Sequence, residues 1–337
     1  MTESAATIGA GAATAVPTPA ATQNGPWPAF TFRDQVPCGT ELPLIDEGSG
    51  PQVLSLSPET SNLEALLALA PTEARPALER IVQSPGSVGL AAYQAGAEAE
   101  GVFLNADAPM PLASVVKVIH LIAYAEAVAA GELTATETVP IADLERFYQP
   151  TLDLRAHTDA VGDMTADGTI FGQPQALLLD GVVRMMIEYS SNAATDYLHM
   201  RLGQEAIESV AKMLDLDRQT APCPFLGQFL TMANHTRPGT SGPAAYDAYV
   251  ARPESYGDEV MQLTTAFSED DAFREEAVAW RRETRRPRGS TQRLFSEQFN
   301  AKGTARSYAA LMARIAQNGL DGPESSFTVR RHLEWPM

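Results

Sequence analysis

The apolar positions divide the chain into stretches of different periodicity. Between residues 58 and 84, leucines and isoleucines stand three or four positions apart, which predicts two short helices separated around Pro71 and Pro76. From residue 85 the pattern changes. Residues 87–94 and 101–105 have the composition of two strands around a Gly/Ala/Glu turn, so they predict a hairpin.

After the hairpin, residues 114–130 form a long apolar run of helical periodicity, and Gly131 is placed to end it in the C′ position. Residues 134–175 are polar and rich in Asp-Gly pairs, which predicts loops. The chain beyond Thr220 has no clear periodicity up to about residue 290, and Thr304 is a candidate N-cap for a helix to about residue 317. Three further helices are predicted at residues 177–188, 193–202 and 204–214.

These patterns divide the chain into three parts. Residues 1–57 form an Ala/Thr/Pro-rich arm that we expect to be disordered, residues 58–84 form the short helices, and residues 85–337 form the main domain. The net charge of −18, from 42 acidic and 24 basic side chains, argues against nucleic acid as a partner. A small substrate remains compatible with this charge, because a local cationic pocket can persist on an acidic protein.

The cysteines and the hydropathy add little. Cys38 and Cys223 are isolated in Pro-rich segments, and their spacing predicts neither a metal site nor a disulfide framework. No apolar stretch is long enough to span a bilayer. Residues 1–28 lack the basic and apolar regions of a secretory signal, which leaves a cytoplasmic location or a start further upstream as alternatives.

One candidate nucleophile begins the apolar helix. Ser114 and Lys117 form a Ser-x-x-Lys tetrapeptide, which places both side chains on one helical face and lets the amine activate the hydroxyl. The first turn of a helix also offers free N–H groups to an oxyanion. Ser209 and Lys212 repeat the spacing, but within a helix that we expect to be solvated, so the tetrapeptide alone does not decide.

A second polar motif, Ser190-Ser191-Asn192, follows between two predicted helices. In such a break Ser190 can relay a proton between the amine and a leaving group, and Asn192 can hold a substrate amide. The structural alternative is a Ser/Asn turn that caps the helix beginning at Ala193.

Together these motifs resemble the serine β-lactamase and penicillin-binding set of Ser-x-x-Lys, Ser-Asp-Asn and Lys-Thr-Gly. The surroundings are also similar to class A β-lactamases over about residues 85–335. The segments that carry this resemblance are VGLAAY, GVFLNADAPMPLASVVKVIHLIAYAEAVAAGEL, MMIEYSSNAATDYLHMRLG and KGTARSYAALMARIAQNG.

The resemblance implies an α/β (α+β) fold of the β-lactamase/D,D-peptidase type, with an all-helical subdomain and helices on an antiparallel sheet. It implies a serine hydrolase in which a β-lactam or related amide acylates Ser114, Lys117 and Ser190 shuttle the proton, and Asn192 orients the substrate. It also implies a bacterial, periplasmic or extracellular monomer linked to antibiotic resistance, without metal or organic cofactor. A D,D-carboxypeptidase or transpeptidase of peptidoglycan and a non-catalytic penicillin-binding sensor are the alternatives.

Two departures from the family pattern stand out. The stretch DRQTAPCPFLGQFLTMAN has no omega-loop Glu to activate the deacylating water, which favours the peptidase alternative. The only candidate for the third motif is Lys302-Gly303-Thr304, in the wrong order and before a helix that Thr304 would cap. We therefore expect a fragment with only the first two strands of the sheet, and a Lys-Thr-Gly box beyond Met337.

The remaining charged residues do not change this interpretation. The arginines between residues 281 and 288 could attract an anionic substrate or polymer, but such a run is more typical of a solvated loop. The five histidines lack ligand spacing, and His120, one turn beyond Lys117, is expected to pack within its helix.

Overall fold

The computed structural model describes Cys38 and residues 70–334, apart from residues 151, 215, 217–218, 221, 238, 240 and 285–286.

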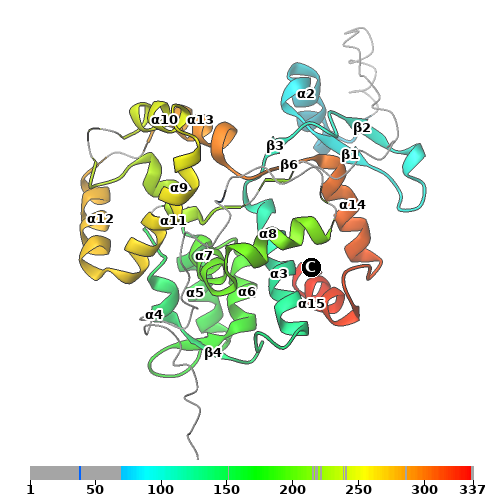
Figure 1. Cartoon of the computed structure of the whole chain (residues 1–337). Helices are drawn as coiled ribbons and strands as arrows, with labels where there is room; N and C mark the ends of the chain where they lie inside the picture. Colours follow the sequence, from blue (N-terminus) through cyan, green and yellow to red (C-terminus); the bar gives the residue numbers. More distant parts are fainter. Residues whose placement is uncertain are drawn as a thin grey trace, which may run out of the picture.

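Helix α3 (Lys117–Ala129) lies at the centre of the molecule (Figure 1). It is preceded by one turn of 3-10 helix, η6 (Ser114–Val116). Its side chains are apolar on nearly every face, so the helix is stable only where other elements cover it. The predicted stop is confirmed, because Gly131 follows the C-cap residue at φ +73°. The helices that pack against α3 are α6 (Leu179–Ile187), α7 (Asn192–Leu202), α8 (Gln204–Met213) and α15 (Pro323–Leu333).

In the part of the chain that the structure describes, the strands form three antiparallel pairs. The predicted hairpin is confirmed as β1 (Leu90–Ala92) and β2 (Val102–Leu104), with Leu90 opposite Leu104. Two further pairs join distant segments and were not predicted, since strands of two or three residues are too short to give an alternating pattern. They are β3 (Met110–Pro111) with β6 (Lys302–Gly303), and β4 (Thr138–Pro140) with β5 (Ala176–Leu178). This helix-rich arrangement with small antiparallel sheets fits the predicted α/β class.

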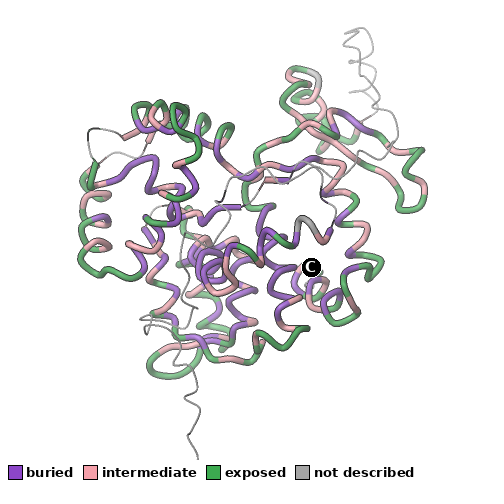
Figure 2. Tube along the Cα trace, viewed as in Figure 1, coloured by how far each residue is buried: buried purple, intermediate pink, exposed green. Residues whose placement is uncertain are grey.

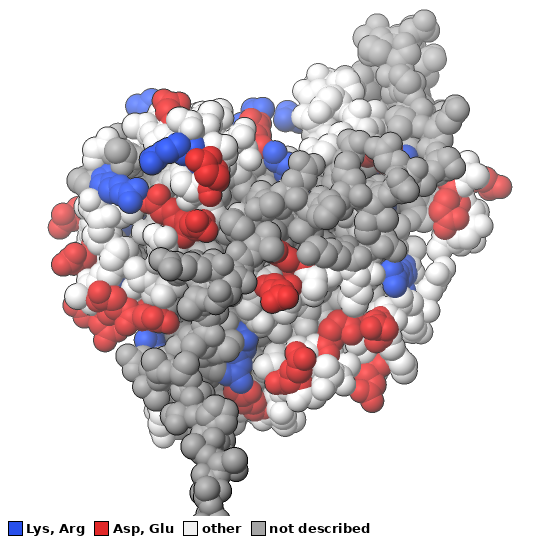
Figure 3. Space-filling model, viewed as in Figure 1, with Lys and Arg blue, Asp and Glu red and all other residues white. Residues whose placement is uncertain are grey.

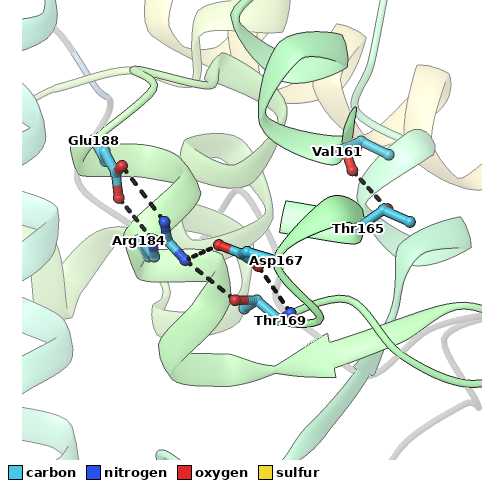
Figure 4. A network of polar contacts seen from close by, with 6 residues as sticks. All are labelled: Val161, Thr165, Asp167, Thr169, Arg184 and Glu188. Carbon is cyan, nitrogen blue, oxygen red and sulfur yellow. Dashed lines mark hydrogen bonds and ion pairs between the residues drawn. The ribbon is translucent and has the colours of Figure 1, made fainter. Parts of the chain in front are cut away.

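The prediction of loops across residues 134–175 is wrong in two places, where the chain forms the helices α4 (Ile141–Glu145) and α5 (Ala156–Ala166). Helix α5 has little amphipathic character and contains Gly162, so its sequence gives a weak helical signal. A polar network fixes the turn that follows it (Figure 4). The guanidinium of Arg184 on α6 donates to Asp167 and Thr169 from that turn and to Glu188 one turn along its own helix.

The prediction of irregular chain between residues 220 and 290 is also wrong. The described residues of this region and its continuation form five helices, which make up a lobe on the left of Figure 1. Its interior is aromatic: Tyr256 stacks on Phe299 with ring centroids 4.3 Å apart, and Tyr249 meets both rings edge-on. The helices are α9 (Phe225–Met232), α10 (Pro243–Val250), α11 (Glu254–Glu269), α12 (Asp271–Glu283) and α13 (Gly289–Phe299).

The second of the two predicted short helices is present as α2 (Arg75–Gln83), and Pro76 lies in its first turn rather than before it. The first predicted helix and the arm, apart from Cys38, lie outside the described residues. Short 3-10 turns lie beside α2 and before β2: η3 (Thr72–Ala74), η4 (Pro85–Ser87) and η5 (Glu98–Glu100).

The prediction that the two cysteines do not pair is wrong. Cys38 and Cys223 form a disulfide across a sequence separation of 185 residues, with their Cα atoms 5.0 Å apart. Spacing along the chain could not predict this bond, because only the folded backbone brings the two positions together.

Burial is concentrated in α3, α6 and α7, whereas α10, α12 and the hairpin are largely exposed (Figure 2). Acidic side chains are spread over the face shown in Figure 3, and several Lys and Arg side chains lie on the lobe of α9–α13. Among the described residues, none of the helices is both long and apolar enough to cross a membrane.

Candidate functional site

Ser114 is the first residue of η6 and is exposed. The chain reaches it through β3, which is held from outside: Pro111 pairs with Lys302 in β6, and the Leu112 N–H donates to the Ala301 carbonyl at 2.7 Å. The start of the helix is therefore positioned by a segment that lies almost 190 residues later in the chain, as the separation of Leu112 and Ala301 shows.

A chain of hydrogen bonds connects Ser114 with Lys117. The hydroxyl of Ser190 donates to Ser114 Oγ at 2.7 Å, and Lys117 Nζ donates to Ser190 Oγ at 3.0 Å. The same amine also donates to the Ser190 carbonyl at 2.6 Å and to Asn192 Oδ1 at 2.9 Å. The structure thus brings together the four residues singled out in the sequence, with Ser190 between the amine and the hydroxyl of Ser114.

Burial alters the acid–base properties of the amine. Lys117 is only 2% exposed, and loss of hydration lowers its pKa to about 8. The negative charges of Asp196 and Asp153 oppose this shift without cancelling it. A substantial fraction of neutral amine, which can accept a proton, is therefore available slightly above neutral pH.

The turn that carries Ser190 and Asn192 also caps a helix. Ser191 is the N-cap of α7, and its hydroxyl accepts the Ala194 N–H at 3.2 Å. Ser190 has φ +63°, a left-handed conformation that is uncommon for serine and typical of constrained functional turns. The motif therefore has both roles: Ser191 caps the helix, and Ser190 and Asn192 contact Lys117.

A family model described as the beta-lactamase enzyme family matches residues 73–334. The chain belongs to the beta-lactamase enzyme family. No curated protein matches the chain. The match covers the hairpin, the apolar helix and both polar motifs, so the resemblance found in the sequence is confirmed at the level of a beta-lactamase-like serine hydrolase family.

Phe225 is a part of this site that the sequence analysis missed. Phe225 is the first residue of α9, and its ring centroid lies 4.9 Å from Lys117 Nζ. Asp196 of α7, fully buried, holds this helix start by accepting the N–H groups of Phe225 and Leu226 at 2.7 Å each. Burial raises the pKa of Asp196 to about 7, against the opposing effect of those two N–H groups. An apolar ring therefore borders the amine in the region where the omega-loop Glu was expected.

The competing Ser-x-x-Lys motif has a different environment. Ser209 is exposed on α8, and its hydroxyl donates to the Ala206 carbonyl at 2.7 Å, as is common for a serine within a solvated helix. The side chain of Lys212 lies outside the described residues.

The reversed Lys302-Gly303-Thr304 motif has a structural role. Lys302 and Gly303 form β6, and Thr304 is the N-cap of α14 (Ala305–Ala316), where its side chain accepts the Ser307 N–H at 3.1 Å. The capping interpretation is confirmed.

The arginine run is only partly as predicted. Arg281 and Arg282 belong to the last turn of α12 rather than to a loop, with Arg281 half-buried and Arg282 exposed, whereas Arg288 is exposed at the N-cap of α13. The packing of His120 is confirmed, since it is buried and its Nε2 lies 3.0 Å from His199 Nδ1.

A cavity of about 600 Å³ lies beside the start of η6. Leu112 and Val115, which flank Ser114 in the sequence, line it together with Thr304 and Tyr308 from the side of α14, whereas Ser114 itself is not among its lining residues. Such a mixed lining suits a small ligand with both apolar and amide groups. Within the described part of the chain, no group of three His, Cys, Asp or Glu side chains is placed to hold a metal ion.

Proposed function

We propose that this protein is a class A-like serine hydrolase that acts on a β-lactam or related amide through an acyl-enzyme on Ser114. The observation that carries the proposal is the hydrogen-bond chain from Ser114 through Ser190 to Lys117, with distances of 2.7 and 3.0 Å. Membership of the beta-lactamase enzyme family supports the same substrate class.

The hydrogen-bond chain can reverse its direction. When Lys117 is protonated, it donates to Ser190, which in turn donates to Ser114. When Lys117 is neutral, its lone pair can accept from Ser190, and Ser190 can then accept the proton of Ser114. A pKa of about 8 allows both states near physiological pH.

Acylation then uses the neutral state. Ser114 Oγ attacks the carbonyl carbon as its proton passes to Ser190, while the Ser190 proton passes to Lys117. As the carbon–nitrogen bond of the amide breaks, the proton returns through Ser190 to the departing nitrogen. The oxyanion that develops on attack lies near the backbone N–H of Ser114 at the start of the helix, and it becomes the carbonyl oxygen of the product, an ester on Ser114.

A peptidoglycan D,D-carboxypeptidase or transpeptidase is the second candidate, and Phe225 favours it. Deacylation by water needs a base beside the ester, but the ring of Phe225 borders Lys117 on the side of α9. The nearby carboxyl of Asp196 is fully buried and accepts the N–H groups of Phe225 and Leu226. A penicilloyl ester in this site should therefore be long-lived, as in a peptidase or a penicillin sensor. The buried disulfide supports an oxidising compartment, in keeping with a periplasmic or extracellular location.

The test is labelling of the full chain with a fluorescent penicillin, followed by intact mass and peptide mapping. We expect an adduct at Ser114 that Ser114→Ala abolishes and the matched control Ser209→Ala retains. Rapid loss of the adduct with released product would identify a β-lactamase, and an adduct that persists for hours would favour a peptidase or sensor. Absence of any adduct in folded protein would refute acylation chemistry at this site.

A further inference from the structure

Ser191 lies between the two residues that contact Lys117, yet its side chain points into the protein and is fully buried. Its hydroxyl lies 3.0 Å from Nδ1 of His157, a fully buried residue of α5. Nε2 of the same ring lies 3.3 Å from Glu145 Oε1, in the last residue of α4. Three residues from separate elements thus form a linear array that ends at the turn of the active site.

The partners determine the direction of these hydrogen bonds. A carboxylate can only accept, so His157 carries a proton on Nε2 and donates to Glu145. In the neutral ring Nδ1 is then an acceptor, and the Ser191 hydroxyl donates to it. Ser191 Oγ meanwhile accepts the Ala194 N–H. Both ring nitrogens of His157 and the Ser191 hydroxyl therefore have compatible partners, and each bond fixes the orientation of the next.

The array resembles a Ser–His–acid triad in its order, but burial excludes Ser191 as a nucleophile. With no exposed surface, its hydroxyl cannot reach a substrate. Its neighbours show a different use. Ser190 holds φ +63°, and this unusual conformation persists only where surrounding bonds fix it. The backbone of Ser191 supplies two such bonds, from its N–H to the Met185 carbonyl at 3.1 Å and from the Thr195 hydroxyl to its carbonyl at 2.7 Å.

We propose that Glu145 and His157 are positioning residues that orient Ser191 and so present Ser190 and Asn192 to Lys117. This inference rests on the proposed acylation of Ser114. His157 is restrained by two further contacts: its backbone N–H donates to the Asp153 carboxylate at 3.1 Å, and the Tyr148 ring lies 4.8 Å from the His157 ring, centroid to centroid. The array therefore transmits the placement of α4 and α5 to the turn before α7.

Two substitutions of the histidine separate positioning from mere packing. In His157→Asn the amide oxygen can take the place of Nδ1 and accept the Ser191 hydroxyl, whereas His157→Leu fills the space without an acceptor. We expect His157→Leu to slow labelling of Ser114 by about tenfold, the effect of losing one buried hydrogen bond, and His157→Asn to restore the rate to within about threefold of the parent. The labelling rate of Glu145→Ala should lie between the rates of the two His157 variants, because Glu145 is partly exposed.

Asp159→Asn is the matched control, since Asp159 lies on the same helix but pairs with Arg155 at the surface. Ser114 of this variant should be labelled at the same rate as in the parent protein. Equal labelling rates in the leucine and parent proteins, or an asparagine variant as slow as the leucine variant, would overturn the positioning role.

A second measurement keeps this inference distinct from the proposed function. Amide hydrogen exchange across residues 190–194 should be faster in His157→Leu than in the parent and near parental in His157→Asn. If the parent is never labelled but exchange follows this order, the acylation proposal fails while the array still holds the turn. If exchange at the turn is unchanged in His157→Leu, the positioning inference fails whatever the labelling shows.

Discussion

Phe225 contributes to the burial of the Lys117 amine. Its ring covers the amine at 4.9 Å, and desolvation is the largest cause of the lowered pKa of Lys117. A carboxylate in this position would stabilise the charged amine and raise its pKa, whereas an aromatic ring removes water and leaves the amine closer to neutrality at pH 7. The residue therefore favours the first half of the reaction, in which a base must take the proton of Ser114.

The rate of Ser114 acylation should accordingly rise with pH and level off above about 8, as the amine loses its proton. In Phe225→Ala water reaches the amine, so its pKa rises and the midpoint of the profile should move up by about one pH unit. The measurement is the labelling rate with fluorescent penicillin from pH 6 to 10. Phe327→Ala is the control, because Phe327 is exposed on α15, and an unshifted midpoint in Phe225→Ala would contradict the desolvation argument.

Behind Lys117, buried polar residues link α3 to α7 and α8. His120 Nε2 lies 3.0 Å from His199 Nδ1, and His199 Nε2 lies 2.7 Å from Gln204 Oε1. Both amide hydrogens of Gln204 are directed to acceptors, one on Glu208 and one on the Pro222 carbonyl, so its Oε1 accepts from His199. Burial lowers the pKa of both histidines, to about 4 for His199.

These histidines should make the protein less stable in mild acid. The unfolded chain binds a proton at His199 below about pH 6.5, whereas the folded protein does so only below about 4, so stability is lost as the pH falls through this window. Each buried histidine contributes up to about 1.4 kcal/mol per pH unit. Urea unfolding at pH 7, 6 and 5 should show a smaller decline for His199→Leu than for the parent. Parallel declines in the two proteins would show that His199 is not buried in its neutral form.

At the level of elements, the contact between α9 and α11 is unusually close. A Cβ atom on Gly227 would lie 2.1 Å from the Val260 carbonyl oxygen and 2.5 Å from Thr264 Oγ1. Only a glycine allows these two helices to approach so closely, and α9 is the helix that begins with Phe225. The packing of the lobe is thus connected directly with the environment of Lys117.

Gly227→Ala should therefore reduce the free energy of unfolding by about 1–3 kcal/mol or more, because the helices must separate to admit the methyl group. Gly162→Ala is the matched control: it lies within α5, where an added Cβ meets no atom within 4 Å, and should stabilise by about 0.5–1 kcal/mol. Chemical denaturation measures both effects. A neutral Gly227→Ala would mean that the two helices can move apart at little cost.

The elements also show what a sequence can predict here. The helix from Ser114 and the cap at Thr304 follow local rules of periodicity and hydrogen bonding, and both are confirmed. The placement of Phe225 depends on Asp196, which lies 29 residues earlier, and an apolar side chain carries no chemical signal of its own. His157 was overlooked for a related reason, since its partners lie 12 and 34 residues away on other elements.

At the level of the whole molecule, the disulfide joins the N-terminal arm to the segment before α9. A crosslink over 185 residues restricts the unfolded chain strongly, and loss of such a bond typically costs about 2–5 kcal/mol. We expect Cys38→Ser/Cys223→Ser to unfold at lower urea than the parent, and a reducing agent to lower the parent to the same level without affecting the variant. Two free thiols in the untreated parent protein would contradict the pairing.

The same bond makes part of the backbone a covalent ring. Ser114, Lys117, Ser190 and Asn192 all lie between Cys38 and Cys223 in the sequence. A protease that cuts one peptide bond inside this ring leaves the reactive residues on a single covalent molecule, whereas the two pieces made by a cut outside it are held together only by noncovalent contacts. During synthesis the ring can close only after Cys223 has left the ribosome, by which time both polar motifs have already emerged.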